Sequence, residues 1–262
     1  MRQQGILVIS HGFRSLKWVL LVDEAVRAVQ VPPGVPIFSA FLEIVEGRTI
    51  QDGIKELERQ GVTEIIAVPF FVSSGSTHLD EIGYALGIKA EPERPTDLVP
   101  FGREASVRIT RPIDDDPQIA ELLVERMGEL SDEPEKEIVI LVAHGSDEPG
   151  FEERWRQGMK LLAERVKKVG GFVVVDYALL LPEEVRNKVI CWQRDCPDHA
   201  VLIAPLFLSE GYFTGTVIPE RLEGLSYRYN GKALLPSPFL SRWIERQIEP
   251  FIDESEHFRS QI

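Results

Sequence analysis

The sequence has 262 residues and a mass of 29.6 kDa, which is enough for one large domain or two smaller ones. Hydrophobic residues make up 44% of the chain and charged residues 27%, a composition typical of a folded globular protein that argues against intrinsic disorder. The formal net charge is -13, and the excess of acidic residues is shared almost equally by the two halves, so no basic region is available to bind nucleic-acid phosphates.

Short apolar runs alternate with segments of helical periodicity over the first 130 residues. In chain order we expect a strand at 5–10, a helix at 15–29, a strand at 36–42, a helix at 49–60, strands at 64–72 and 106–111, and a helix from 117 to 127. Asp116 directly before Pro117 is typical of a helix N-terminal cap, which explains the acidic run 114–116 better than a cation site does. The alternation predicts an α/β fold, with a small parallel sheet covered by helices on both faces.

The pattern of the first half starts again in the second half. Two pairs of segments match in order, spacing and residue type: 6–13 (ILVISHGF) with 138–146 (IVILVAHGS), and 68–75 (VPFFVSSG) with 204–211 (APLFLSEG). A third pair, 112–127 and 236–247, matches with a shift in spacing. His144 stands 133 positions after His11, and the polar segment 131–136 between the copies resembles a linker. We therefore predict two tandem copies of one α/β unit, a domain at 1–130 that carries the metal site and a degenerate repeat of it at 137–252.

Three potential metal ligands follow predicted strands of the first copy. Ligands bind parallel α/β sheets at the carboxyl ends of the strands, where His11, Glu43 and His78 are expected. Two imidazoles and one carboxylate predict a site for a divalent first-row metal ion with open coordination positions. A single histidine at a strand end more simply hydrogen-bonds within its own loop, so the metal interpretation depends on three donors occurring at equivalent places.

The second copy keeps only His144 of these donors. A constant spacing of 136 places Leu179 opposite Glu43 and Thr214 opposite His78. Because leucine and threonine supply neither an imidazole nor a carboxylate, we do not expect the second copy to bind a metal in the same way.

Residues 10–14 read SHGFR, residues 41–43 read FLE, and residues 68–78 read VPFFVSSGSTH. Together with the duplication, these segments resemble the G-H-G-S-R, F-L-E and V-P-L-F-L-x-x-G-x-H motifs of the class II chelatases. These are the CbiX/SirB-type sirohydrochlorin cobaltochelatases and ferrochelatases, here in the long duplicated form. The resemblance spans nearly the whole chain and implies two tandem chelatase-like, flavodoxin-like domains facing each other across a cleft.

The resemblance also implies roles for the three strand-end residues. His11 and His78, with Glu43 nearby, would hold Fe2+ or Co2+, which is a substrate of the reaction. The same residues would be catalytic, because an imidazole near neutral pH can act as a metal ligand or accept a pyrrole proton. Glu43 would assist coordination or orient an imidazole.

A tetrapyrrole such as sirohydrochlorin carries many carboxylates, so an acidic protein must supply local groups to bind it. Arg14, on the turn after His11, is our first choice for a substrate-binding cation. Ser73 and Ser74 either hydrogen-bond substrate carboxylates or satisfy backbone groups at a strand end.

The sequence departs from the family motifs at the proposed site. The family spacing would place the second histidine at Thr77, one residue before His78, so either the loop is longer or His78 is displaced. Residues 81–83 (EIG) replace the family's D-I-P, and Ser10 and Phe13 replace a glycine and a serine. These departures indicate a divergent branch, in which the metal and the exact tetrapyrrole can differ.

The sequence therefore predicts an enzyme, a lyase-type chelatase of sirohaem or cobalamin biosynthesis that inserts Fe2+ or Co2+ into sirohydrochlorin or a related tetrapyrrole. Neither G-x-x-x-x-G-K-[ST] nor G-x-G-x-x-G occurs, which agrees with a reaction that uses no nucleotide. The alternative is a non-catalytic metal or tetrapyrrole carrier with the same fold. A hydrolase or transferase is a third possibility, although neither G-x-S-x-G nor H-E-x-x-H is present to support it.

Two cysteines, Cys191 and Cys196, match no C-x-x-C pattern, and the N-terminus shows no signal-peptide pattern, so we expect a cytoplasmic protein. The apolar runs are shorter than the roughly 20 residues that a spanning helix needs, so we expect no membrane partner. Because one chain holds both halves of a pseudo-two-fold pair, we expect a monomer.

Overall fold

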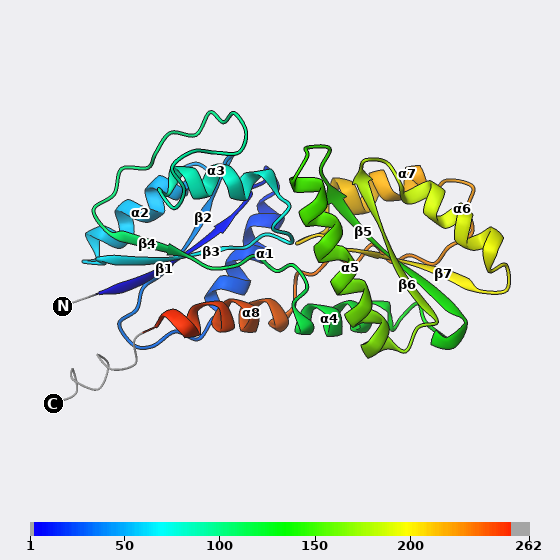
Figure 1. Ribbon diagram of the computed structural model, residues 1–262. Helices are drawn as coiled ribbons and strands as arrows, with labels where there is room; N and C mark the ends of the chain where they lie inside the picture. The colour runs from blue at the N-terminus through cyan, green and yellow to red at the C-terminus, as the bar shows by residue number, and fades with distance from the viewer. Residues whose placement is uncertain (1–2, 253–262) are drawn as a thin grey trace. The chain divides into compact units, whose positions relative to one another are not determined.

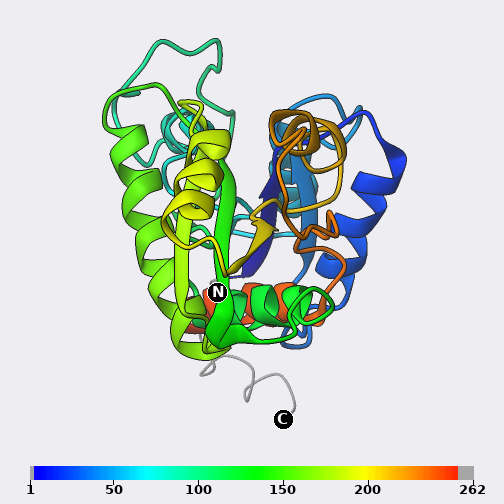
Figure 2. The ribbon, with the colours of Figure 1, turned by 90° about the vertical axis from the view of Figure 1, so that its right-hand side faces the viewer.

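The computed structural model describes residues 3–252. The chain forms two compact units, and the strands of each unit lie side by side in one sheet (Figures 1 and 2). Among the described residues, the first unit comprises 3–71, 77–112 and 240–252, and the second comprises Val72–Ser76 and Ile113–Phe239. Each unit combines a parallel sheet with helices, which confirms the predicted α/β class. Within residues 3–252, every helix is too short or too polar to cross a bilayer.

The first unit contains a four-stranded parallel sheet in the order β2-β1-β3-β4. Its strands are β1 (Gln4–Ser10), β2 (Ile37–Phe41), β3 (Glu64–Pro69) and β4 (Ser106–Ile109). All residues of β1 are buried, because helices cover a central parallel strand on both faces, and this burial explains the continuous apolar run. All four strands lie where the sequence predicts them; β1 begins one residue earlier than expected, and the other three are shorter.

Helices cover both faces of this sheet. They are α1 (Leu16–Arg27), α2 (Ile50–Arg59) and α3 (Thr77–Ala85). α2 and α3 pack against Leu7 and Ile9 of β1, whereas the alternate residues Ile6 and Val8 point to the opposite face. The connection from β1 to β2 and the connection from β2 to β3 run in opposite directions across the sheet. Because such crossovers are right-handed, their helices α1 and α2 lie on opposite faces.

Most of helix α8 (Pro238–Ile248) also belongs to the first unit, although it lies near the end of the described chain. Ser241 Oγ donates a hydrogen bond to the carbonyl oxygen of Ala25 in α1 at 2.9 Å. Trp243 is fully buried and stacks on Phe70, with 5.7 Å between the ring centroids. α8 therefore completes the core on the α1 face of this sheet.

The second unit contains a three-stranded parallel sheet in the order β6-β5-β7. Its strands are β5 (Glu137–Gly145), β6 (Val174–Leu181) and β7 (Ala200–Pro205). Its helices are α4 (Pro117–Met127), α5 (Phe151–Gly170), α6 (Val185–Asp195) and α7 (Ile218–Arg221), with short helical turns at Pro134–Lys136 and Phe213–Val217. A further turn at Glu249–Phe251 follows α8 in the first unit. α6 and α7 pack against Ile138, Ile140 and Val142 of β5, and α4 packs against α5.

The last helix of each sequence repeat packs in the unit of the other repeat. α4 ends the first repeat but contacts α5 and β7, and α8 ends the second repeat but contacts α1. The compact units therefore differ from the predicted domains 1–130 and 137–252 in the placement of these two helices; residues 1 and 2 lie outside the described chain. The physical reason is that an amphipathic helix specifies a face to bury and leaves open which sheet covers it.

The acidic run before α4 has structural partners within the second unit. Asp116 caps α4 as predicted, because its carboxylate accepts hydrogen bonds from two backbone N–H groups of the first turn. Asp115 accepts from Arg165 at 2.7 Å, and Asp114 accepts from the backbone N–H of Ser74 at 2.7 Å. These contacts agree with capping and loop support as the function of the run.

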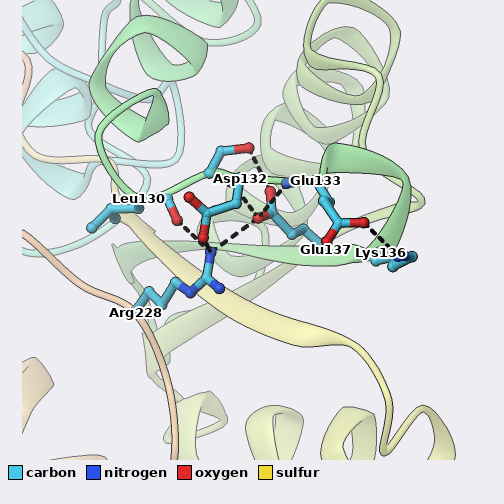
Figure 3. A network of polar contacts seen from close by, with 7 residues as sticks. Leu130, Asp132, Glu133, Lys136, Glu137 and Arg228 are labelled. Carbon is cyan, nitrogen blue, oxygen red and sulfur yellow. Dashed lines mark hydrogen bonds and ion pairs between the residues drawn. The ribbon is translucent and has the colours of Figure 1, made fainter.

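The buried carboxylate of Glu137 fixes the start of β5 (Figure 3). It accepts hydrogen bonds from Ser131 Oγ, from the backbone N–H of Asp132 at 2.7 Å and from Arg228 Nη1 at 3.1 Å. Burial raises the pKa of Glu137, but these hydrogen bonds together outweigh burial and hold the pKa below its usual value. Since Arg228 also donates to the carbonyl oxygen of Leu130 at 2.7 Å, the segment expected as a linker is tied to the second unit.

Trp243→Ala should lower the free energy of unfolding by about 3–5 kcal/mol, because it leaves a cavity beside Phe70. Trp243→Phe should cost less, since Trp243 Nε1 is buried without an acceptor among the described residues. Urea denaturation measures both changes, with the exposed Leu16→Ala as the control. A Trp243→Ala loss no larger than that of the control would contradict the placement of α8 in this core.

Candidate functional site

His11 directly follows β1 at the carboxyl end of the first sheet. Its Nδ1 donates a hydrogen bond to the carbonyl oxygen of Gly12 at 2.9 Å, so Nδ1 carries the proton and Nε2 keeps its lone pair when the ring is neutral. Nε2 lies 3.6 Å from Glu43 Oε1. The structure therefore brings two of the three predicted donors together, from two adjacent strands.

Gly12 makes this approach possible. Its φ is +98°, and a Cβ at this position would lie 2.1 Å from the carbonyl oxygen of Glu43. The backbone N–H of Glu43 donates to the carbonyl oxygen of His11 at 3.2 Å, which holds the two turns together. Only glycine combines this φ with so close a backbone contact.

His78 is the second residue of α3 and lies against His11. The two rings meet edge to face, with 4.5 Å between centroids and 73° between planes. His78 Nδ1 lies 2.6 Å from Glu81 Oε1, and because a carboxylate only accepts, Nδ1 carries the proton. Burial lowers the pKa of His78 below its ordinary value of 6.5, and the hydrogen bond that His78 donates to Glu81 partly offsets this.

The site is open to solvent. The side chains of His11, Glu43 and His78 are 39%, 52% and 36% exposed. Both imidazoles have an anchored Nδ1 and an Nε2 that is available to a cation, the arrangement in which protein histidines usually bind metals. Among residues 3–252, no three His, Cys, Asp or Glu side chains already form a metal-binding cluster, so the ligand set His11, His78 and Glu43 stays a prediction.

The three predicted substrate-binding residues differ in their surroundings. Arg14 is exposed on the turn after His11, in the first unit. Ser73 and Ser74 belong to the second unit. Ser73 Oγ accepts a hydrogen bond from the backbone N–H of Gly75 at 3.0 Å, so this serine supports its own turn. Their substrate-binding roles stay predictions.

The second unit repeats the backbone of the site with different side chains. His144 Nδ1 donates to the carbonyl oxygen of Gly145 at 3.1 Å, as in the first unit. Its ring meets Phe213 edge to face, with 5.0 Å between centroids. A Cβ on Gly145 would lie 2.1 Å from the carbonyl oxygen of Leu181, which therefore stands where Glu43 stands in the first unit.

These equivalences correct the positions expected from a constant spacing of 136. Leu179 pairs with Ala143 in the sheet, so Leu179 corresponds to Phe41, which pairs with Ser10. Phe213, next to the expected Thr214, provides the ring that faces the strand-end histidine. Loops of unequal length shift the spacing from one element to the next. Both replacements are apolar, so the second unit lacks the carboxylate and the second imidazole.

Sequence reasoning missed the partner of His78. The sequence marks Glu81 only as a departure from the family motif. Residues three apart on a helix are neighbours, and this spacing between His78 and Glu81 was the available signal.

The CbiX family model matches residues 5–130 and 138–251 of the chain. The two matches together cover most of the sequence, and the chain therefore belongs to the CbiX family. This membership confirms the expected family, a CbiX/SirB-type chelatase group.

Two curated relatives are chelatases. A sirohydrochlorin cobaltochelatase of Methanopyrus kandleri is 28% identical over 139 residues, which span 48% of this chain and 95% of that protein. A sirohydrochlorin ferrochelatase of Priestia megaterium is 27% identical over 228 residues, which span 85% of this chain and 79% of that protein. The first match has the size of one repeat, and the second extends over both.

A solved structure shares the fold. SirB from Bacillus subtilis, determined with Fe3+, superposes with a TM-score of 0.72 at 18% sequence identity. The superposition covers 97% of each chain. The two chains therefore share the duplicated α/β fold.

Gly12→Ala should destabilise the protein more than Gly34→Ala, although both glycines have a positive φ. Gly34 has no atom within 4 Å of a built Cβ, so its replacement costs only the backbone strain of roughly 1–2 kcal/mol. At Gly12 the carbonyl group of Glu43 must also move. Chemical denaturation measures the difference, and equal losses would contradict the close approach.

Proposed function

We propose that the chain catalyses insertion of Fe2+ or Co2+ into sirohydrochlorin or a related tetrapyrrole, without a nucleotide. The observation that carries this proposal is the histidine pair of the first unit, with ring centroids 4.5 Å apart and Glu43 beside it. Family membership and the chelatase relatives support a tetrapyrrole as the second substrate.

The metal ion is cargo in this reaction. Nε2 of His11 and Nε2 of His78 hold the ion, and Glu43 assists by supplying negative charge close to His11. Each Nδ1 is fixed by a hydrogen bond, so both rings present the same kind of lone pair to the ion.

The protons of the reaction balance on the same two rings. Insertion of a divalent ion forms bonds to the ring nitrogens and releases two pyrrole protons. When the ion passes from a histidine to the macrocycle, the freed Nε2 regains its lone pair and can accept one proton. His11 and His78 together therefore accept as many protons as the reaction releases, and solvent removes these protons from the exposed rings.

The carboxylates of the substrate need cationic and hydrogen-bonding partners. Arg14 is exposed and lies three residues after His11 in the chain. We assign Arg14 to a substrate carboxylate, and we assign Ser73 and Ser74 to weaker hydrogen bonds in the same role. The protein acts as a monomer in this proposal, and a light-scattering mass of one chain tests that part.

His11→Ala and His78→Ala should each abolish metal insertion and leave the fold intact, because each removes one ligand and one proton acceptor. The experiment is an anaerobic absorbance time course of sirohydrochlorin with Fe2+, and separately with Co2+. His144→Ala is the matched control, since its ring has the same backbone anchor but faces Phe213, and it should retain activity.

Three outcomes are informative in this experiment. Turnover lost in both site variants and kept in the control supports the chelatase. Turnover that survives in His11→Ala contradicts it. Stoichiometric binding without turnover in the wild-type protein favours the non-catalytic carrier instead.

Co2+ binding should weaken as the pH falls, because a protonated imidazole neither binds a cation nor accepts a proton. Burial lowers the pKa of His78 below 6.5, so its ring should stay neutral at a lower pH than an ordinary histidine. The unfolded chain binds more protons at this residue, so acidification below 6.5 should also reduce the stability of the apo protein. NMR titration of the His78 ring, assigned with His78→Gln, checks this; a midpoint above 6.5 contradicts it.

A further inference from the structure

The two histidines of the site are anchored by different kinds of group. His11 Nδ1 bonds to a backbone carbonyl, which no substitution of a side chain can remove. His78 Nδ1 bonds to the carboxylate of Glu81 at 2.6 Å, one turn further along α3. The second oxygen of this carboxylate, Oε2, accepts a hydrogen bond from Thr96 Oγ1 at 2.8 Å. Both oxygens of Glu81 are therefore engaged, one by the histidine and one by a loop.

We propose that Glu81 is a positioning residue for metal transfer, which fixes His78 in the orientation that presents Nε2 to the ion, and that Thr96 holds Glu81 in place. This inference rests on the proposed function, because it requires His78 to be a metal ligand. Glu81 acts through His78 and does not touch the ion.

The chemistry of the pair supports this role. A neutral imidazole has one N–H and one lone pair, and the group beside Nδ1 decides which nitrogen carries which. A carboxylate accepts only, so Glu81 keeps the proton on Nδ1 and leaves the lone pair on Nε2. The carboxylate also makes the imidazole a stronger electron donor towards a cation.

The loop that carries Thr96 is held on α3 by neighbouring contacts. Asp80, the residue before Glu81, is buried and accepts a hydrogen bond from the backbone N–H of Glu93 at 2.8 Å. Lys89 forms ion pairs with Asp80 and with Glu93. Two consecutive acidic residues of α3 therefore attach the same loop, and this attachment gives Thr96 a defined position over Glu81.

A matched pair elsewhere in the unit separates positioning from helix stability. Glu56 on α2 pairs with Arg59 at the same spacing of three residues, at 2.7 Å, and its partner is not a predicted metal ligand. Glu56→Gln removes the same charge from a helix of the same unit. It controls for any effect of losing one surface carboxylate.

The test measures Co2+ binding to full-length wild-type protein, Glu81→Gln, Glu81→Asp, Thr96→Val, Glu56→Gln and His78→Ala. Affinity is read by competition with a chromogenic chelator, and the ligand field is read from the visible absorption of bound Co2+. Steady-state insertion rates give kcat and the KM for the tetrapyrrole, and thermal unfolding verifies that each variant is folded.

We expect Glu81→Gln to weaken Co2+ binding by about 10- to 100-fold, the usual effect of removing a partner of a ligating histidine. Its Co2+ absorption should shift and its kcat should fall, while the KM for the tetrapyrrole stays unchanged. Glu81→Asp, which keeps the carboxylate but is shorter, should fall between wild type and Glu81→Gln. Thr96→Val should change affinity in the same direction by a smaller factor, and Glu56→Gln should match wild type.

Three results would overturn the proposal, and they are distinguishable. If Glu81→Gln and Thr96→Val match wild type in affinity and spectrum while His78→Ala loses Co2+, then Glu81 has no positioning role and the proposed function stands. If His78→Ala itself binds Co2+ like wild type, then His78 is not a ligand and both proposals fail. Loss of thermal stability in Glu81→Gln without any change in the Co2+ spectrum of the folded fraction would assign Glu81 to helix stability and also overturn the proposal.

Discussion

The candidate site depends on the close approach of two backbone turns at the carboxyl end of the first sheet. Gly12 lies so near the carbonyl oxygen of Glu43 that a Cβ would stand 2.1 Å from it, and this contact carries His11 to within 3.6 Å of the Glu43 carboxylate. The second unit repeats the contact between Gly145 and Leu181, whose side chain carries no carboxylate. The approach of the turns is thus a property of the fold, and the chemistry comes from the side chains that the first copy adds to it.

The two copies preserve a structural ion pair while they differ at the site. In the first unit the buried Glu64, on β3, pairs with Arg108 at 2.8 Å. In the second unit the buried acid is Glu137, which lies on the central strand β5. It pairs with Arg228 at 3.1 Å. Arg108 and Arg228 hold corresponding places, since they pair with β3 and β7 respectively. A buried carboxylate without its partner is costly, and each unit supplies an arginine beside its buried acid. No such cost applies where leucine and phenylalanine stand in place of the partly exposed Glu43 and His78.

The sequence predicted the strands, the repeat and the strand-end histidines, because buried parallel strands are continuous apolar runs and their ends are marked by turns. It did not predict that α4 and α8 pack in the opposite unit, since an amphipathic stripe is satisfied by either sheet. The constant spacing of 136 failed at Leu181 because loop lengths differ between the copies. The contact of Thr96 with Glu81 could not be predicted from the sequence, because 15 residues of chain separate them and include a polar loop without periodicity.

The site combines fixed orientation with open access, and the two properties come from different parts of the fold. The orientation of each ring is fixed by the group that accepts a hydrogen bond from its Nδ1. This group is the carbonyl oxygen of Gly12 for His11 and the carboxylate of Glu81 for His78. Access of solvent and ligands to the site is possible because the side chains of His11, His78 and Glu43 are each more than a third exposed. A metal that stays bound is usually enclosed by its full ligand set, whereas a metal that must pass to a planar macrocycle needs donors that the macrocycle can approach. In the proposed reaction, anchoring of each Nδ1 leaves Nε2 free for that approach, so a fixed ring orientation does not require burial of the ring.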